Sequence, residues 1–284
     1  SSPFSCFFSM PNVTTAACSQ LWNLRGYQNT PVAACATGTI AIGEAYDAIR
    51  FGRASMMLAG AGESLNSVCA IWNIDVLGAL SRETSSPERA SCPFSLQRSG
   101  FVLSEGGAVL CLEERESALA RGATILAEVT GYANFSDAVD FTSPAEDCVA
   151  REQTIRWALR AADLQPADLD YINAHGTSTP LNDINETRSL KKALGDEAYR
   201  IPVSSTKAYS GHLIAAAGSF ETIVCLQAMA AGIMPATAHL TQPDPQCDLD
   251  YIAEGHRQGE IRRALNLSFG FGGANAALVL EKHG

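Results

Sequence analysis

The sequence has few charged residues, no long apolar run and no signal peptide that we recognise. Charged residues make up 18% of its 284 residues and hydrophobic residues 46%, so the chain can bury a large core and disorder is excluded. The net charge of −10 excludes wholesale binding to nucleic acid. Because no apolar run is judged long enough to cross a bilayer, we expect no membrane association.

Several motifs that would assign a chemistry directly are also absent. The chain has no CxxC pair and no HExxH helix, so we expect no bound metal. It has no Walker motif and no G-x-S-x-G elbow. The glycine-rich turn from Gly270 is not a dinucleotide fingerprint, because Asn275 stands where GxGxxG requires its third glycine.

The nine cysteines do not form a disulfide pattern. Their number is odd, their spacing is irregular, and some, such as Cys111 and Cys225, lie in apolar runs. This favours free thiols in a reducing compartment, and we expect a cytoplasmic protein. An organellar location is the alternative, because the chain begins Ser1-Ser2-Pro3-Phe4 without an initiator methionine, so a targeting segment can be missing from this sequence.

Short β-rich runs alternate with helical runs, which predicts an α/β fold with mostly parallel, buried strands. The expected strands are Pro31–Cys35, Ser55–Gly60, Phe101–Glu113, Thr124–Tyr132, Leu169–Ala174, Ile201–Ser205, Ala264–Ser268 and Ala276–Glu281. The expected helices are Gly38–Arg53, Arg115–Arg121, Ala150–Ala162, Asp183–Leu194 and His212–Ala231.

A weak internal repeat suggests two related halves, 1–120 and 121–284. The run PVAAC at 31–35 resembles PVSST at 202–206, and each precedes a helix of small residues. Two glycine-preceded apolar strands, 100–114 and 270–281, both end in Leu-Glu. The N-terminal half lacks opening strands that the repeat implies, so we expect this half to be incomplete and the chain to be a fragment of a longer protein.

Cys35 lies where a predicted strand ends and a helix begins. The unpaired N–H groups and the dipole at a helix N-terminus favour a thiolate, and small neighbours leave space for an acyl group. A buried structural cysteine is the alternative at this stage.

His175 follows an apolar strand and precedes a Gly-Thr-Ser-Thr turn, where parallel α/β sheets bind ligands. His212 follows Gly211 at a probable helix start, five residues after Lys207. One thiolate and two imidazoles are the groups needed for covalent acyl transfer. Asp183 and Glu186 lie three residues apart on one predicted helix, and a capping-box-like helix start accounts for their spacing.

Four segments in this order resemble the β-ketoacyl-[acyl carrier protein] synthases of the elongating type. They are ACATG from 34, NAHGTSTPLND from 173, SSTKAYSGHLIAAAG from 204 and NLSFGFGGANA from 266, and the likeness extends from about Asn12 to the C-terminus. The resemblance implies the thiolase-like fold, a duplicated α/β unit in layered sheets. It also implies that substrates arrive on the phosphopantetheine of an acyl carrier protein, that no cofactor is bound, and that the protein is a dimer.

The resemblance also implies catalytic roles. Cys35 would hold the growing acyl chain as a thioester. His175 and His212 would assist decarboxylation of a malonyl group and stabilise the enolate that then attacks this thioester. Lys207 would order the site together with Glu186, and Asp183 matches a nearby family acid.

Substrate-binding roles follow in the same way. Thr177 and Thr179 would hold the pantetheine arm, with Phe269 beside them. Phe271 matches the aromatic gate next to the nucleophile, and its N–H would join that of Cys35 in an oxyanion hole.

The sequence departs from the family in one run. Where an Asp-x-x-Arg-Asp-Gly run is usual, Ser95 and Ser99 replace the two acids around Arg98, which implies a missing salt bridge. Fatty-acid elongation is our first interpretation, and the catalytic ketosynthase of a type II polyketide or polyene synthase is the alternative. A homodimer or a heterodimer with a chain-length-factor-like subunit is expected accordingly. A thiolase is disfavoured because 264–284 contain no cysteine, and a starter-type synthase because His212 is not Asn. A non-catalytic scaffold subunit is a further alternative, and it predicts that Cys35 is not acylated.

Overall fold

The structure is a computed structural model, and it describes residues 10–284. The main helices are α1 (Val13–Leu21), α2 (Thr37–Arg50), α3 (Val68–Asp75), α4 (Arg115–Ala120), α5 (Val149–Ala161), α6 (Pro180–Leu194), α7 (Lys207–Ser210) and α8 (Ala217–Ala231). The strands are β1 (Met56–Glu63), β2 (Gly106–Glu113), β3 (Glu128–Ser136), β4 (Tyr171–Asn173), β5 (Val203–Ser204), β6 (Ile233–Met234), β7 (Arg257–Gln258), β8 (Arg263–Gly270) and β9 (Ala274–Glu281).

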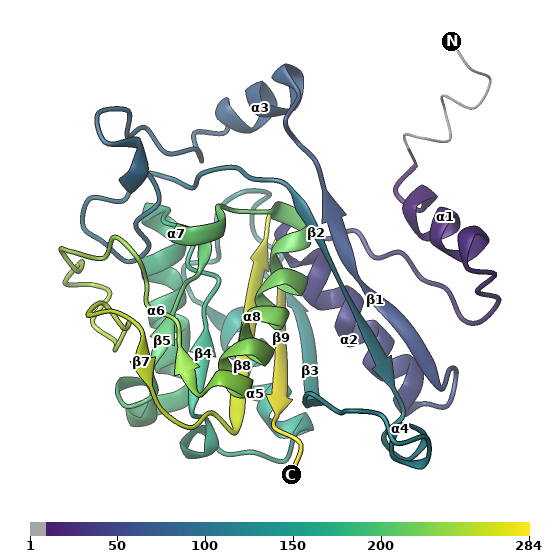
Figure 1. Ribbon diagram of the computed structural model, residues 1–284. Coiled ribbons are helices and arrows are strands. Elements are labelled where there is room, and N and C mark those ends of the chain that lie inside the picture. The colour runs from purple at the N-terminus through teal and green to yellow at the C-terminus, as the bar shows by residue number, and fades with distance from the viewer. Residues whose placement is uncertain (1–9) are drawn as a thin grey trace.

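A five-stranded sheet in the order β3-β9-β8-β4-β5 forms the centre of the molecule (Figure 1). Helices α5 and α6 cover one face of this sheet, and α8 packs on the other face beside α2. The antiparallel pair β1-β2 lies against α2 and α8 as a further layer. This layered arrangement is the thiolase-like α/β fold that the resemblance implies.

Strand β9 shows why both helix layers are needed. Its side chains alternate between the two faces, so Ala277 and Val279 join the core under α5 and α6, whereas Leu280 joins the core under α8. The prediction of mostly parallel strands was wrong. Only β4 pairs in parallel, with β5 and β8, and the other pairings are antiparallel. An unbroken apolar run reports burial of both faces, and here antiparallel strands are buried in that way.

Most predicted elements occur close to their expected positions, but three differ. Residues Pro31–Cys35 form no strand; a 3-10 turn over Ala34–Ala36 takes their place, because Ala34 has φ +46°. The strand expected from Phe101 begins only at Gly106. The helix expected from His212 begins at Ala217, after a second 3-10 turn over Ile214–Ala216.

One apolar stretch needs comment because we expected none long enough for a membrane. Residues Ile214–Ala231 form a stretch of 18 residues with a mean hydropathy of 1.5, which by length and composition alone is long and apolar enough to cross a membrane. Of this stretch, 56% is buried inside the fold. Its apolar character is therefore explained by packing between the sheet and α2.

The eight cysteines of the described part are all free thiols. Cys35, Cys92, Cys148, Cys225 and Cys247 are buried. Cys6 lies outside the described residues. Packing accounts for most of the buried thiols, and Cys35 differs from the others because it borders a cavity.

Candidate active site

Cys35 is the middle residue of the 3-10 turn that leads into α2. The residue before it, Ala34, has φ +46°, a conformation that costs an L-residue energy and is typical of functional turns. The turn is held by the N–H of Ala36, which donates to the carbonyl of Ala33 at 3.0 Å, and by the N–H of Ala33, which donates to Oγ1 of Thr37 at 2.9 Å. Only 4% of Cys35 is exposed.

Burial raises the pKa of the Cys35 thiol to about 11. The ammonium of Lys207 lowers this pKa, as do the backbone N–H groups of Phe271 and of Cys35 itself, but the cost of desolvating the thiolate outweighs them. The backbone N–H groups at the helix N-terminus therefore favour the thiolate, as expected, but burial has the larger effect. The resting group is a thiol, and it must lose its proton when it attacks.

His175 stands directly after β4, and its turn is fixed by a carboxylate. Glu186 on α6 accepts the N–H of His175 at 2.7 Å and the N–H of Gly176 at 2.8 Å. Gly176 has φ +37°, and a Cβ there would lie 2.4 Å from the side chain of Ser205, so glycine is required. Glu186 positions His175 through the backbone rather than through its ring.

His212 is placed by a similar turn, after Gly211 with φ +69°. The N–H of Ile214 donates to Nδ1 of His212 at 3.3 Å. Because Nδ1 accepts, the neutral ring carries its proton on Nε2, which is buried without a protein partner. Burial, together with the charge of Lys207, lowers the pKa of both His175 and His212 well below the usual value, so both rings are neutral.

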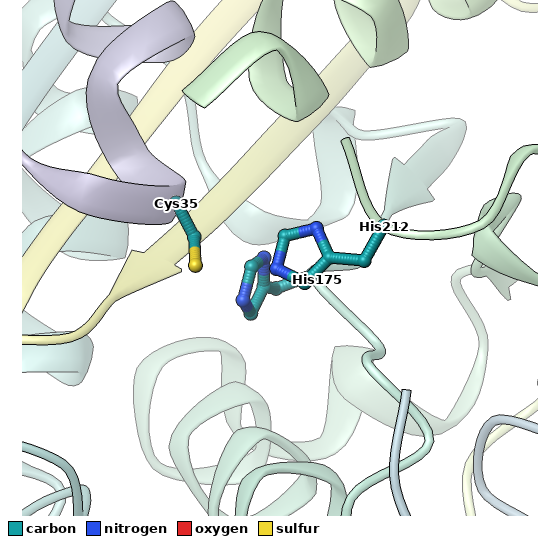
Figure 2. A group of neighbouring side chains, drawn as sticks. All are labelled: Cys35, His175 and His212. Atoms are coloured by element: carbon teal, nitrogen blue, oxygen red, sulfur yellow. The ribbon is translucent and has the colours of Figure 1, made fainter. Parts of the chain in front are cut away.

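The three predicted reactive groups converge. A ligand atom from each of Cys35, His175 and His212 lies within 4.8 Å of the other two, although the residues come from distant parts of the chain (Figure 2). The two imidazole rings meet edge to face with centroids 5.4 Å apart. Figure 2 shows the sulfur pointing toward the imidazoles.

Cysteine and histidine are also ligands that zinc prefers, and these three residues lie close enough together to hold a metal ion. The expectation of no bound metal therefore stays a prediction. Lys207 lowers the pKa of both histidines, although its ammonium is itself ion-paired with Glu221. Neutral imidazoles at this place can donate hydrogen bonds to an anion such as an enolate oxygen.

Lys207 is fully buried, and its ammonium forms an ion pair with Glu221 on α8. Glu186, which we expected to order the site together with Lys207, contacts it differently: its carboxylate accepts the N–H groups of His175 and Gly176. Burial raises the pKa of Glu221 to about 7, and Lys207 opposes this shift. Sequence reasoning missed Glu221, although a lone acid within the apolar run of α8 was the available signal.

A cavity of about 360 Å³ connects these groups. Seven of the ten predicted site residues line it: Cys35, His175, His212, Thr177, Thr179, Phe269 and Phe271. Apolar residues next to the thiol, including Phe101 and Ala79, form one wall. Polar residues form another, where Oγ1 of Thr177 and Oγ1 of Thr179 lie 2.9 Å apart. Asp183, Glu186 and Lys207 act from outside the lining.

Asp183 anchors the loop in which the sequence departs from its family. It accepts the N–H of Phe94 at 2.8 Å and lies 3.6 Å from Nε of Arg98. Arg98 also pairs with Asp244 at 2.7 Å. The salt bridge that we expected to be missing is therefore present, because acids from elsewhere in the chain serve Arg98. Ser99 takes part in a surface hydrogen bond with Ser81 instead.

These observations define a class of protein. A buried cysteine with two neutral histidines, at a cavity in a thiolase-like fold, is the equipment of an acyltransferase that works through a cysteine thioester.

Comparison with known proteins gives the family. The family model described as Beta-ketoacyl synthase, N-terminal domain, matches residues 1–118, and the one described as Beta-ketoacyl synthase, C-terminal domain, matches residues 126–241. The chain belongs to the β-ketoacyl synthase family.

Two relatives illustrate the range of this family. The chain is 42% identical to 3-oxoacyl-[acyl-carrier-protein] synthase 2 of a Synechocystis species, an alignment that covers 99% of the chain and 68% of the relative. It is also 42% identical to a putative polyketide beta-ketoacyl synthase 1 of Streptomyces halstedii, with 95% and 64% covered. The chain therefore spans about two thirds of the length of these relatives.

Solved structures of ketosynthases are similar to this chain as well. A ketosynthase bound to the hexaketide, in complex with the acyl carrier protein of a type II polyketide synthase, has a TM-score of 0.94 at 38% identity, and 98% of this chain and 68% of that chain are covered. The ishigamide ketosynthase/chain length factor has a TM-score of 0.83 at 34% identity, with 90% and 61% covered.

Proposed function

We propose that the protein condenses a cysteine-bound acyl chain with a malonyl group, giving a β-ketoacyl thioester on an acyl carrier protein. The convergence of Cys35, His175 and His212 at one cavity carries this proposal. Fatty-acid elongation is our first assignment. The catalytic ketosynthase of a type II polyketide synthase is the second, and the 42% identity to a polyketide relative supports it.

The first step is transfer of the acyl chain. The Cys35 sulfur attacks the thioester carbonyl of the acyl carrier, forms a new carbon–sulfur bond and expels the carrier's pantetheine thiolate. The proton of the Cys35 thiol ends on that leaving thiolate, which leaves as the free carrier thiol. The N–H groups of Cys35 and Phe271, which are directed at the sulfur, would stabilise the oxyanion of this step.

The second step makes the carbon–carbon bond. The malonyl group loses CO2, and the electron pair of the broken bond forms an enolate at the thioester carbonyl. The Nε2–H of His212 is oriented to donate to that oxygen, and His175 would act with it. The enolate carbon attacks the acyl carbonyl and expels the Cys35 thiolate, which takes up a proton from water to become the resting thiol again.

The proposal extends to partners and location. The hydroxyls of Thr177 and Thr179 on the cavity wall suit a pantetheine arm, so an acyl carrier protein is the proposed partner. We propose a cytoplasmic dimer, with two copies of this chain or with a chain-length-factor-like subunit. The chemistry uses only this chain's own groups and the carrier's pantetheine, so no further cofactor is required.

Separate assays of the two steps test the proposal. His175→Ala and His212→Ala should still accept an acyl group on Cys35 from an acyl-carrier thioester, as seen by intact mass, but release of CO2 from malonyl carrier should fall sharply. His283→Ala, which removes an imidazole paired with Glu128 away from the cavity, is the matched control. Normal decarboxylation by both active-site variants would remove the assigned roles.

A further inference from the structure

Arg151 is a buried cation that the proposed mechanism has not used. It lies in the first turn of α5, is 5% exposed and lines the same cavity as Cys35. Its guanidinium stacks on Phe269, with Cζ 4.1 Å from the ring centroid. Its Nη1 donates to Oδ1 of Asn182 at 3.0 Å, whereas its Nε is buried without a hydrogen-bond partner.

If only the stability of the fold is considered, this placement of Arg151 is unfavourable. Burying a cation without a paired anion costs several kcal/mol, and the N-terminal end of a helix disfavours positive charge. Within residues 10–284, no carboxylate lies within ion-pair distance of Arg151. Asn182 connects it indirectly to Glu186, to which Nδ2 of Asn182 donates at 3.3 Å. The stacked ring and this link offset part of the cost, but of the five guanidinium N–H donors only one, on Nη1, has a hydrogen-bond partner among residues 10–284.

The lining of the cavity indicates what kind of ligand the unpaired guanidinium N–H groups of Arg151 can bind. The apolar wall beside the thiol suits an acyl chain, and Arg151 belongs to the other, polar wall with Asn182 and the two threonines. Phe269 contacts both groups: its ring centroid lies 4.1 Å from Cζ of Arg151 and 5.8 Å from the centroid of the His175 ring. The guanidinium and the imidazole that faces the enolate are therefore neighbours of the same aromatic ring.

We propose that Arg151 binds the carboxylate of the malonyl extender before CO2 is lost. This rests on the proposed function, in which that carboxylate is the anion brought next to the two histidines. The guanidinium of an arginine stays protonated, and it donates a charge-assisted hydrogen bond to such a carboxylate. The site thereby distinguishes a malonyl thioester from an acyl thioester that has no second carboxyl group.

The consequence for catalysis has a definite direction. During decarboxylation the negative charge leaves the carboxylate and moves to the enolate oxygen beside the histidines, so the bond to Arg151 is lost in the transition state. Binding of that kind helps capture but does not speed the chemical step. Arg151 should lower KM for the malonyl carrier and leave kcat unchanged or slightly reduced.

The experiment compares two ligands that differ only in charge. The probes are a malonyl-pantetheine analogue in which an amide replaces the thioester, and its counterpart with a terminal carboxamide in place of the carboxylate. The parent protein should bind the carboxylate probe about tenfold or more tightly than the carboxamide. Arg151→Met should bind both equally, and Arg151→Lys should recover part of the preference. The KM for malonyl carrier in Arg151→Met should rise by a similar factor.

Controls separate this inference from the function on which it rests. Arg156→Met also removes a positive charge from α5, but Arg156 lies outside the cavity and bonds to Glu152 and to the carbonyl of Lys192, so the preference should persist. Acylation of Cys35 by an acyl carrier should be unchanged in all three variants. Equal binding of both probes by the parent, or an undiminished preference in Arg151→Met, overturns the role of Arg151. Failure of the parent to acylate Cys35 instead overturns the proposed function.

Discussion

The chain builds one turn-and-helix unit twice, before α2 and before α8. Each unit begins with a residue of positive φ, Ala34 at +46° and Ile214 at +47°, continues as a three-residue 3-10 turn, and leads into a helix of 14 or 15 residues. The middle residue of the turn is Cys35 in the first unit and Ala215 in the second. The backbone is thus duplicated, whereas the nucleophile is present once.

The second unit has a different task. The N–H of Ile214 fixes the tautomer of His212, so this turn orients a hydrogen-bond donor instead of presenting a nucleophile. The two helices pack through reciprocal glycines. A Cβ at Gly38 would lie 2.6 Å from the backbone N of Ser219, and one at Gly218 would lie 2.0 Å from Oγ1 of Thr39. The comparison teaches that local backbone geometry creates a place for chemistry, and that the side chain placed there decides which chemistry it is.

The largest expected effect comes from replacing Cys35 by alanine, which gives the first turn the same middle residue as the second. Cys35→Ala should abolish the acyl adduct and lower condensation by about a thousandfold or more, because the covalent intermediate can no longer form. The measurement is intact mass after incubation with an acyl carrier, together with turnover. Ala215→Cys is the matched control: residue 215 does not line the cavity, so its thiol should stay unacylated in the Cys35→Ala background. An adduct there would end the functional distinction between the units.

A titration sharpens the comparison at the first turn. Burial holds the pKa of Cys35 at about 11, above its ordinary value, so the proton stays on sulfur at neutral pH and the thiolate fraction grows as pH rises. Alkylation of Cys35 by iodoacetamide in the free enzyme should therefore accelerate about tenfold per pH unit between pH 7 and pH 10. Peptide mapping by mass spectrometry follows the modification. A rate that levels off near pH 7 would show that the turn stabilises a thiolate after all.

The helix contact can be broken directly. Gly218→Ala should destabilise the fold by about 1–3 kcal/mol, because its Cβ would collide with Thr39 and with Oγ of Ser268 at 2.7 Å. Urea unfolding measures the loss. Gly26→Ala is the control, since no atom lies within 4 Å of the added Cβ, and it should change stability by no more than about 0.5 kcal/mol. Equal stability of both variants would mean that the helices can separate without cost.

The smallest expected effect concerns the positive φ of the first turn. Ala34→Gly should be nearly neutral, because relief of the strained backbone offsets the extra entropy of glycine in the unfolded chain. Ala36→Gly, two residues on at φ −91° and fully buried, should cost about 1 kcal/mol, since no strain is relieved there. Thermal unfolding of the pair gives the difference, and an equal loss in both variants would show that Ala34 is unstrained.

The sequence was sufficient for α2, α4, α5, α6 and α8, though not for α1, α3 and α7, and for the convergence of Cys35, His175 and His212. Apolar periodicity and the small residues beside each reactive group are local signals. The direction of a strand depends on which distant strand it pairs with, so local signals did not predict it. The tight turn between β8 and β9 makes an antiparallel pair whose two faces are both covered, so its apolar runs looked like parallel strands. The pKa of Cys35 depended mainly on burial, which outweighs the effect of the backbone N–H groups at the helix N-terminus and which local sequence does not report.

Ion-pair partners were the least predictable part of the site. Lys207 and Glu186 were expected to order the site together, but Glu221, the ion-pair partner of Lys207, was not foreseen, and Glu186 instead accepts two backbone N–H groups. Arg98 likewise found acids far away in the sequence. Such choices are settled by which groups remain unsatisfied once the fold is complete.

The hairpin of β8 and β9 is synthesised long after the nucleophile. Residue 35 leaves the ribosome before Phe271, whose backbone N–H lowers the pKa of the Cys35 thiol and which lies in the turn between β8 and β9. Strand β9 sits between β3 and β8, so the sheet has a gap until that strand has been made. A nascent chain that stalls before residue 274 therefore carries its thiol without the completed sheet beside it.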